Sequence, residues 1–148
     1  MGSGSSGLSG IRGSGGLLSK IDQMGDENEV DNLLPMSPSD VLRNGGRVAL
    51  RQMRNSGTPI VYHNEEVNIS DLETEQATVF KEVLRPIAQN VHGEISGWNA
   101  IENPTSRTDT GIRAVRYNGH LTIVDGNNRV NVAILNGQKR IKIRVVDI

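Results

Sequence analysis

The stretch LTIVDGNNRVNVAILNG, residues 121–137, is the most informative about the fold because its pattern changes from strand-like to helical in the middle. Its first residues form an apolar run that is typical of a strand, and Asp125-Gly126 breaks that run. The residues that follow have helical spacing through Ile134, and Gly137 stands where a left-handed glycine ends a helix. We therefore predict a strand, a tight turn and a short helix.

Two more strands are predicted around this unit. GIRAVRY and HLTIVD flank Asn118-Gly119, a dipeptide that favours positive φ at both turn positions and so predicts a two-residue β-hairpin. After the helix, RIKIRVVDI (residues 140–148) alternates basic and apolar side chains, which predicts a strand with one buried and one basic face. Strand, helix and strand together predict a βαβ-like unit with residues 125–129 at its first corner.

The preceding residues predict shorter elements. Ser37 is a suitable N-cap, with Pro38 at the first helical position, for a helical segment within residues 34–57. TPIVYH and VNISDL are predicted strands, and the helical pattern after them contains Pro86, which predicts a kink or two shorter helices. Residues 92–111 are rich in Gly, Asn, Pro, Ser and Thr and are predicted to be mostly loop.

The first 33 residues differ in composition from the rest. MGSGSSGLSGIRGSGG is nearly all Gly and Ser, and an acidic polar stretch follows it, so we predict a flexible tail or linker over residues 1–33. The first seven residues are compatible with a cloning remnant. Scattered apolar residues such as Leu17 and Ile21 could instead dock on a protein partner. The predicted fold is thus α+β, a small mixed sheet with helices over residues 34–148, preceded by this tail.

Composition limits the class of protein. The formal net charge of −1 argues against a uniformly basic nucleic-acid binder, so any phosphate-binding surface must be local. The absence of Cys excludes disulfides, thiolate metal sites and a Cys nucleophile. No apolar run approaches the roughly 20 residues that span a bilayer, and the N-terminus lacks the apolar core of a secretory signal peptide. A cytoplasmic protein or a delivered or particle-associated one is expected.

The corner at residues 125–129 has the chemistry of an anion site. A helix that starts directly after a strand presents unpaired N–H groups, and Gly126 lets the backbone turn sharply and a ligand approach closely. Asn127 or Asn128 can cap the helix or donate to an oxyanion. Arg129 in the first turn is unfavourable for the helix dipole unless an anion lies nearby. The corner predicts phosphate or carboxylate binding, and the alternative is a tight turn with an Asn cap and a solvent-facing arginine.

Residues 121–147, LTIVDGNNRVNVAILNGQKRIKIRVVD, resemble the core of the ParB N-terminal/sulfiredoxin-like superfamily. That family has a strand leading to Asp-Gly-x-x-Arg, a small-residue helix, a glycine and a further strand. The resemblance implies that Gly126 and Arg129 bind phosphate, with Asn127 and Asn128 between them, and that Asp125 is the common acidic residue before the glycine.

Members of the family differ in activity. They include nucleotide-binding partition proteins, an ATP-using sulfinic acid reductase, free-serine kinases and nucleases. Many enzymatic members have His where this chain has Asn128, and partition proteins have a Glu-Arg pair at Asn127 and Asn128. Because the reductase needs a Cys in the corner, that activity is excluded here.

Further candidate residues lie around the corner. His120 is a candidate base and Asp125 a candidate catalytic acid, whereas His63, His92 and His120 are too scattered to define a metal site. Trp98 could stack on a base or hold its loop against the core. The candidates for contact with a nucleic-acid backbone are Arg113, Arg116, Lys142 and Arg144, and a merely basic sheet face is the alternative.

Three hypotheses follow. The first is a domain that binds nucleotide or nucleic-acid phosphate and acts as a nuclease or phosphotransferase, for example an effector or toxin domain, with nucleotide and Mg²⁺ as candidate cofactors. The second is a binding module without catalysis. The third is a structural or interaction protein, such as a virion component or adaptor, that reuses the fold.

Overall fold

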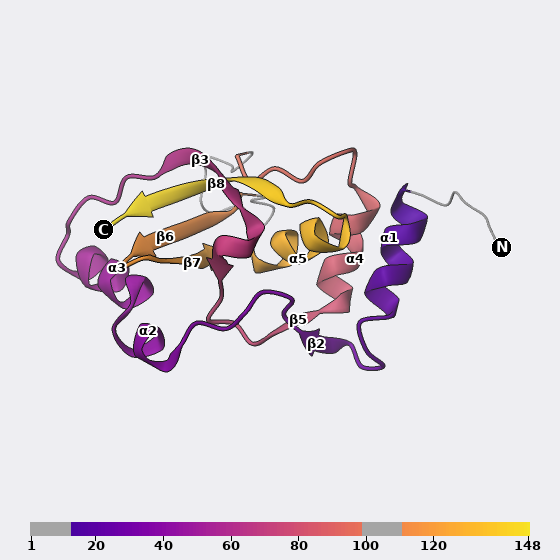
Figure 1. The fold of residues 1–148 in the computed structure, drawn as a ribbon, viewed down its shortest axis with the longest axis horizontal. Coiled ribbons are helices and arrows are strands. Elements are labelled where there is room, and N and C mark those ends of the chain that lie inside the picture. The colour runs from indigo at the N-terminus through magenta and orange to yellow at the C-terminus, as the bar shows by residue number, and fades with distance from the viewer. Residues whose placement is uncertain (1–12, 99–110) are drawn as a thin grey trace.

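A five-stranded mixed sheet forms the centre of the protein in a computed structural model, which describes residues 13–98 and 111–148 (Figure 1). In spatial order its strands are β3 (His63–Asn68), β8 (Arg140–Asp147), β6 (Arg113–Tyr117), β7 (His120–Asp125) and β4 (Leu72–Glu73). A second sheet pairs β2 (Glu29–Asp31) with β5 (Thr78–Phe80). The helices are α1 (Gly13–Asp22), α2 (Ser39–Asn44), α3 (Gly46–Asn55), the 3-10 helix η1 (Ile69–Asp71), α4 (Lys81–Gln89) and α5 (Asn127–Leu135). The predicted α+β class is confirmed.

The predicted hairpin is present between β6 and β7. Asn118 and Gly119 form its turn with φ values of 51° and 81°, the positive values that a two-residue turn of this kind requires. Gly137, just after α5, also has a positive φ of 82°, as the sequence predicted for the end of that helix.

The β7–α5–β8 segment is not a βαβ unit, so that prediction is wrong. β6 lies between the two strands, antiparallel to β7 and parallel to β8, and β7 therefore runs antiparallel to β8. The two-residue turn fixes β6 against one edge of β7, and β4 pairs with the other edge. Because both edges of β7 are then occupied, β8 can join only on the far side of β6.

The two faces of the sheet are covered differently. Ile141, Ile143 and Val145 of β8 are buried on one face, which we call the helical face, where α5 lies with α4 and α1 beyond it (Figure 1). Val115 and Val146 point to the opposite face and contact Leu50 of α3, so we call that side the α3 face. The alternation of side chains along β8 thus supplies two separate cores.

Residues 13–33 are not a flexible tail, and the prediction for that part of the chain is wrong. Leu17 and Ile21 of α1 are buried in the main core, because their spacing of four residues puts both on one helical face against α4 and α5. Val30 of β2 is buried with them. Residues 1–12, the rest of the predicted tail, lie outside the described residues.

Several predicted boundaries also differ. Ser37 is buried and donates to Glu73 Oε1 at 2.8 Å, and Pro38 occupies the N-cap position of α2. The predicted strand TPIVYH is irregular up to β3, while VNISDL is divided among β3, η1 and β4. Pro86 lies inside the single helix α4, so the chain does not form two shorter helices there. Residues 92–98 are irregular as predicted, and 99–110 lie outside the described residues.

Candidate functional site

Gly126 shapes the corner between β7 and α5 by its conformation. It is the N-cap residue of α5, with φ 101° and ψ 20°, a left-handed conformation that glycine adopts readily. A Cβ atom at this position would lie 3.0 Å from the Gly111 carbonyl oxygen and from the Ile112 Cα atom. The side of Gly126 that lacks a side chain therefore faces the protein's own backbone. The expectation that this space admits a ligand is wrong.

Asn127 points into the protein. Its side-chain oxygen accepts hydrogen bonds from Asn32 Nδ2 at 3.0 Å and Thr74 Oγ1 at 2.7 Å, and the residue is 6% exposed. The fully buried Asn131, one turn later, donates to Asn32 Oδ1 and accepts from the Leu33 amide. This buried polar cluster ties residues 32–33 to α5, so the Asn127 side chain serves the fold and is not directed to a ligand.

The first turn of α5 keeps its donors unpaired. No side chain caps the helix, contrary to the prediction for Asn127 or Asn128. Within residues 13–98 and 111–148, nothing accepts a hydrogen bond from the amides of Asn128 and Arg129, and both residues are partly exposed. These amides add to the positive end of the helix dipole.

Arg129 carries an uncompensated charge beside these amides. Its Nη2 donates to the Ser96 carbonyl oxygen at 3.3 Å, whereas its Nε atom is buried and has no partner. No carboxylate in the described part of the chain pairs with it. Burial lowers the pKa of Arg129, because a guanidinium that leaves water loses solvation of its charged form. Since an arginine stays protonated at neutral pH, the corner holds a half-buried cation that lacks an anion.

The two predicted catalytic residues lie far apart. Asp125 is exposed at the end of β7 and pairs with Arg113 Nη2 at 2.9 Å. His120 begins the same strand, and its Nδ1 lies 2.7 Å from Glu73 Oε2. Five residue steps along a strand separate the two by about 17 Å. The structure therefore does not bring His120 near the α5 corner, because the hairpin turn and the helix start lie at opposite ends of β7.

Three of the four predicted nucleic-acid-binding residues share one side of the sheet. Arg113 lies opposite Arg144 in the β6–β8 register, and Lys142 precedes Arg144 by two residues, so all three point to the α3 face. Arg116 lies opposite Leu121, a residue of the main core, and so points to the helical face. The structure separates Arg116 from the other three.

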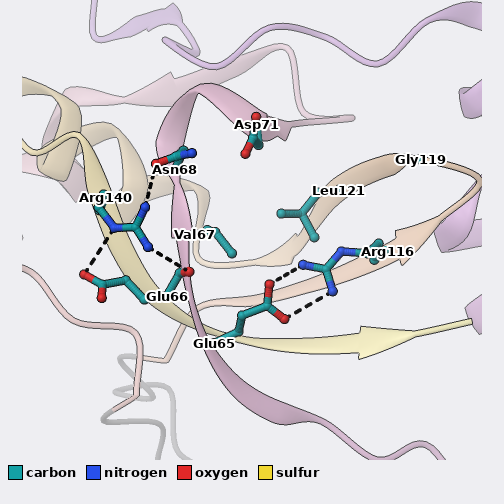
Figure 2. Close-up of a pocket in the computed structure, with 9 residues that line it drawn as sticks. All are labelled: Glu65, Glu66, Val67, Asn68, Asp71, Arg116, Gly119, Leu121 and Arg140. Carbon is teal, nitrogen blue, oxygen red and sulfur yellow. Dashed lines mark hydrogen bonds and ion pairs between the residues drawn. The ribbon is translucent and has the colours of Figure 1, made fainter.

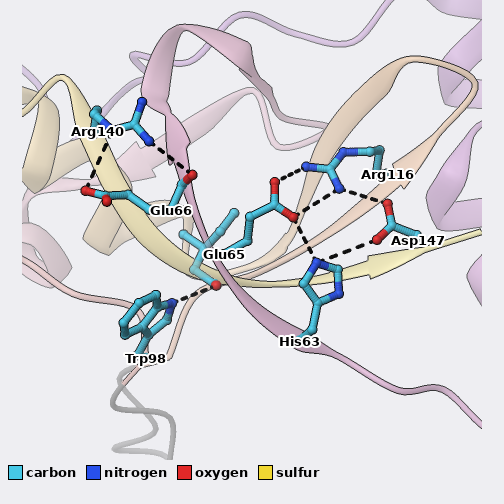
Figure 3. Close-up of polar contacts among 8 residues, drawn as sticks. His63, Glu65, Glu66, Trp98, Arg116, Arg140 and Asp147 are labelled. Atoms are coloured by element: carbon cyan, nitrogen blue, oxygen red, sulfur yellow. Dashed lines mark hydrogen bonds and ion pairs between the residues drawn. The ribbon is translucent and has the colours of Figure 1, made fainter.

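Arg116 belongs to an ion-pair network instead (Figure 3). Its guanidinium makes two hydrogen bonds with Glu65 and one of 2.8 Å with Asp147 Oδ1, and these contacts raise the pKa of Arg116. His63 Nε2 lies 2.8 Å from Glu65 Oε1 and 3.6 Å from Asp147 Oδ2. The Arg116 guanidinium, and then His63, lower the pKa of the Glu65 carboxyl. The network joins β3, β6 and the end of β8.

A groove of about 560 Å³ lies beside this network (Figure 2). Its lining includes Glu65, Asp71, Arg116 and Arg140 together with Gly119 of the hairpin turn. Arg140 donates to Asn68 Oδ1 at 2.8 Å and lies 3.7 Å from Glu66, so both arginines of the groove have carboxylate partners. The groove is at the hairpin end of the sheet and does not include the α5 corner.

The sequence did not reveal the partners of these groups. Each contact joins residues that are far apart in the sequence: Glu73 and His120 are separated by 47 positions, Ser96 and Arg129 by 33, and Asn32 and Asn127 by 95. The position of Glu65 could have been predicted in part. It precedes Val67 by two residues in a strand, so its carboxylate lies on the same face of the sheet as that core residue.

No protein-family model, curated protein or solved structure matches the chain. Among the described residues, no helix is both long enough and apolar enough to cross a bilayer. In the same part of the chain, no three His, Asp or Glu side chains are grouped so that they could hold a metal ion.

Proposed function

We propose that the start of α5 binds the phosphate of a nucleotide or nucleic acid. The amides of Asn128 and Arg129 and the guanidinium of Arg129 supply the donors. The observation that carries the proposal is the state of Arg129, which is half-buried, has a buried Nε without a partner, and lies at the positive end of a helix. An anion at this point compensates the charge and accepts from the unpaired donors.

A contrast with other arginines supports this assignment, and Arg129 differs from Arg144, which also lacks a carboxylate partner among the described residues, in that its Nε atom is buried without a partner. Arg113, Arg116 and Arg140 each have a carboxylate partner within 4 Å, so the protein itself neutralises them. Within the described residues, the polar partner of the Arg129 side chain is a backbone carbonyl oxygen, that of Ser96. A buried donor without a partner costs free energy in the folded state, and a bound anion is a physical reason for a protein to retain it.

Binding without catalysis is the form of the proposal that the geometry favours. An acid–base pair would need both groups within hydrogen-bonding reach of one substrate. Asp125 and His120 are at opposite ends of β7, and each already has a partner of opposite charge or polarity. The resemblance to the ParB N-terminal/sulfiredoxin-like superfamily supports phosphate binding through the Gly126–Arg129 corner. For nuclease or phosphotransferase activity, the described residues offer no acid–base pair among the two candidates, Asp125 and His120.

A second candidate function is a structural or interaction protein that reuses the fold. The observation that favours it is the internal use of the corner: Gly126 faces the backbone of residues 111–112, and Asn127 is held by Asn32 and Thr74. In that case the corner stabilises the fold and has no affinity for phosphate.

Calorimetric titration with inorganic pyrophosphate and with a nucleoside triphosphate, each with and without Mg²⁺, separates the two candidates. We expect saturable binding that weakens about 10–100-fold in Arg129→Ala, since a charge-assisted hydrogen bond contributes about 1.5–3 kcal/mol. Arg43→Ala is the matched control, because Arg43 is an exposed arginine of α2 outside the corner. Equal affinity of the wild type and Arg129→Ala, or no binding by the wild type, would contradict the proposal.

A further inference from the structure

The α3 face of the sheet carries a second group of cations beside an exposed aromatic ring. Lys142 and Arg144 of β8 point to this face, and Trp98 is 38% exposed next to them. α3 lies against β6, β7 and Val146 near the end of β8. We call Trp98, Lys142 and Arg144 the tryptophan face.

The Trp98 ring is held in a fixed position. Its Nε1 donates to the Ile143 carbonyl oxygen at 2.9 Å, so one edge of the indole is attached to the backbone of β8 (Figure 3). The Lys142 Nζ atom lies 5.2 Å from the ring centroid, in the range of a cation–π contact. An aromatic ring that is fixed at one edge and partly exposed can accept a second planar group by stacking.

The charge of the tryptophan face is not balanced by the protein. On the same side of the sheet, Arg113 is neutralised by Asp125, and Glu66, which lies directly opposite Lys142 in the β3–β8 register, forms its ion pair with Arg140 at 3.7 Å. Within the described residues neither Lys142 nor Arg144 has a carboxylate partner. Two uncompensated cations thus lie beside one exposed aromatic ring, although the whole chain has a formal charge of −1.

We propose that the tryptophan face binds single-stranded nucleic acid. A base stacks on Trp98, and the phosphates on either side of it contact Lys142 and Arg144, which is the combination that sequence-independent single-strand binders use. The bases of a duplex are stacked on one another, so they cannot stack on a ring at the surface of a sheet. Because neither stacking nor phosphate contacts detect the 2′-hydroxyl, DNA and RNA strands should bind equally well.

This proposal goes beyond phosphate binding at the start of α5 and does not depend on it. Among the described residues, no hydrogen bond or ion pair joins Arg129 to Trp98, Lys142 or Arg144, although Ser96 is a partner of both Arg129 and the Trp98 amide. A variant of Arg129 therefore tests one proposal, and variants of the tryptophan face test the other.

Trp98 also provides the measurement, because the chain has one Trp. Intrinsic fluorescence is followed while the full chain is titrated at low salt with oligothymidylate or oligouridylate of about 12 nucleotides, a length within the usual site size. We expect equal quenching by both. The corresponding duplex and a polyglutamate peptide should leave the fluorescence unchanged. Equal quenching by polyglutamate would overturn the proposal and indicate an acidic protein partner instead.

Variants are compared by the fluorescence anisotropy of a labelled oligothymidylate. Trp98→Leu should weaken binding about tenfold by the loss of stacking, and Trp98→Phe should retain most of the affinity because the ring remains. Arg144→Gln should weaken binding about threefold and lower the salt dependence of log K by about 0.7. Arg43→Gln, an equal change of charge on α2, should bind as the wild type does.

The outcomes against the proposal are equally definite. Wild-type affinity in a Trp98→Leu variant that retains its far-ultraviolet circular dichroism would exclude stacking. If Trp98→Leu fails to fold, Arg144→Gln decides, and an effect no larger than that of Arg43→Gln would exclude the tryptophan face as the binding surface.

Discussion

Replacement of Arg129 by Met should make the protein more stable when no anion is present. The substitution removes a buried Nε that has no partner, which costs about 1–3 kcal/mol in the folded state. It also removes a cation from the first turn of α5, where the dipole disfavours it by about 0.3–1 kcal/mol. The loss is the 3.3 Å hydrogen bond to the Ser96 carbonyl oxygen, about 1 kcal/mol. Met fills much of the space of the arginine stem, so the net gain in unfolding free energy is about 1 kcal/mol.

A bound anion should reverse this order. If phosphate binds at Arg129, an anion at about 100 times its Kd stabilises the wild type by about 2.7 kcal/mol and stabilises Arg129→Met, with a Kd about 10–100-fold higher, by only about 0.4–1.4 kcal/mol. The wild type is then the more stable by about 0.3–1.3 kcal/mol. Urea denaturation of both proteins, in a buffer without phosphate and with pyrophosphate, measures the four free energies.

Arg140→Met is the control for this experiment. Arg140 is an exposed arginine with partners in Glu66 and Asn68, so its loss should lower the unfolding free energy by less than about 1 kcal/mol and leave the pyrophosphate response intact. If Arg129→Met is less stable than the wild type in the buffer without phosphate, Arg129 stabilises the fold and its charge is not an unfavourable one that awaits an anion.

Three other substitutions test how the fold is built. Gly126→Ala should lower the unfolding free energy in urea by about 2–4 kcal/mol, since it combines positive φ with a Cβ 3.0 Å from backbone atoms, whereas Gly57→Ala, at φ 76° in open space, should cost about 1 kcal/mol. Equal losses would show that φ alone matters. Asn127→Ala should cost about 1–3 kcal/mol in the same assay, because it removes the 2.7 Å acceptor of the buried Thr74 hydroxyl and one acceptor of Asn32 Nδ2, which still donates to the Gln76 carbonyl oxygen. A loss below about 1 kcal/mol would contradict the structural role of this buried polar cluster. Glu65→Gln should flatten the acid side of the stability profile: contact with Arg116 lowers the Glu65 pKa from 4.5, so its contribution is present above that pH and is lost as the pH falls through the lowered value. An unchanged profile in pH-dependent urea titrations would exclude that contribution.

The polar contacts of the corner show why the same residues can be assigned to structure or to function. Asn127 and Asn131 hold residues 32–33 against α5. These contacts fix the segment between β2 and α2 beside that helix. Arg129 is on the same helix but takes no part in this cluster. On α5, Asn127 and Asn131 therefore stabilise the fold, whereas Arg129 in the first turn lacks such a partner. This difference between residues of one helix supports phosphate binding over a purely structural corner.

Local sequence determined the features that depend on a few adjacent residues. Asn118-Gly119, Gly126 and Gly137 all have positive φ, and α5 ends before Gly137 as predicted, because the steric limits on φ act within one or two residues. The alternation in β8 was also predicted, since successive side chains of any strand point to opposite faces.

Only the tertiary structure decided which groups meet. Asn32 and Thr74 hold Asn127 and Glu73 holds His120, although no local pattern connects the members of these pairs. Asp125 and Arg113 belong to the predicted hairpin, but a register shift in it brings them opposite each other. The packing of Leu17 and Ile21 against α4 and α5 could not be predicted for the same reason. The Gly- and Ser-rich composition around them does not indicate that distant helices supply an apolar surface. A backbone angle is fixed by the atoms of its own residue and its neighbours, but the partner of a side chain depends on the path of the whole chain.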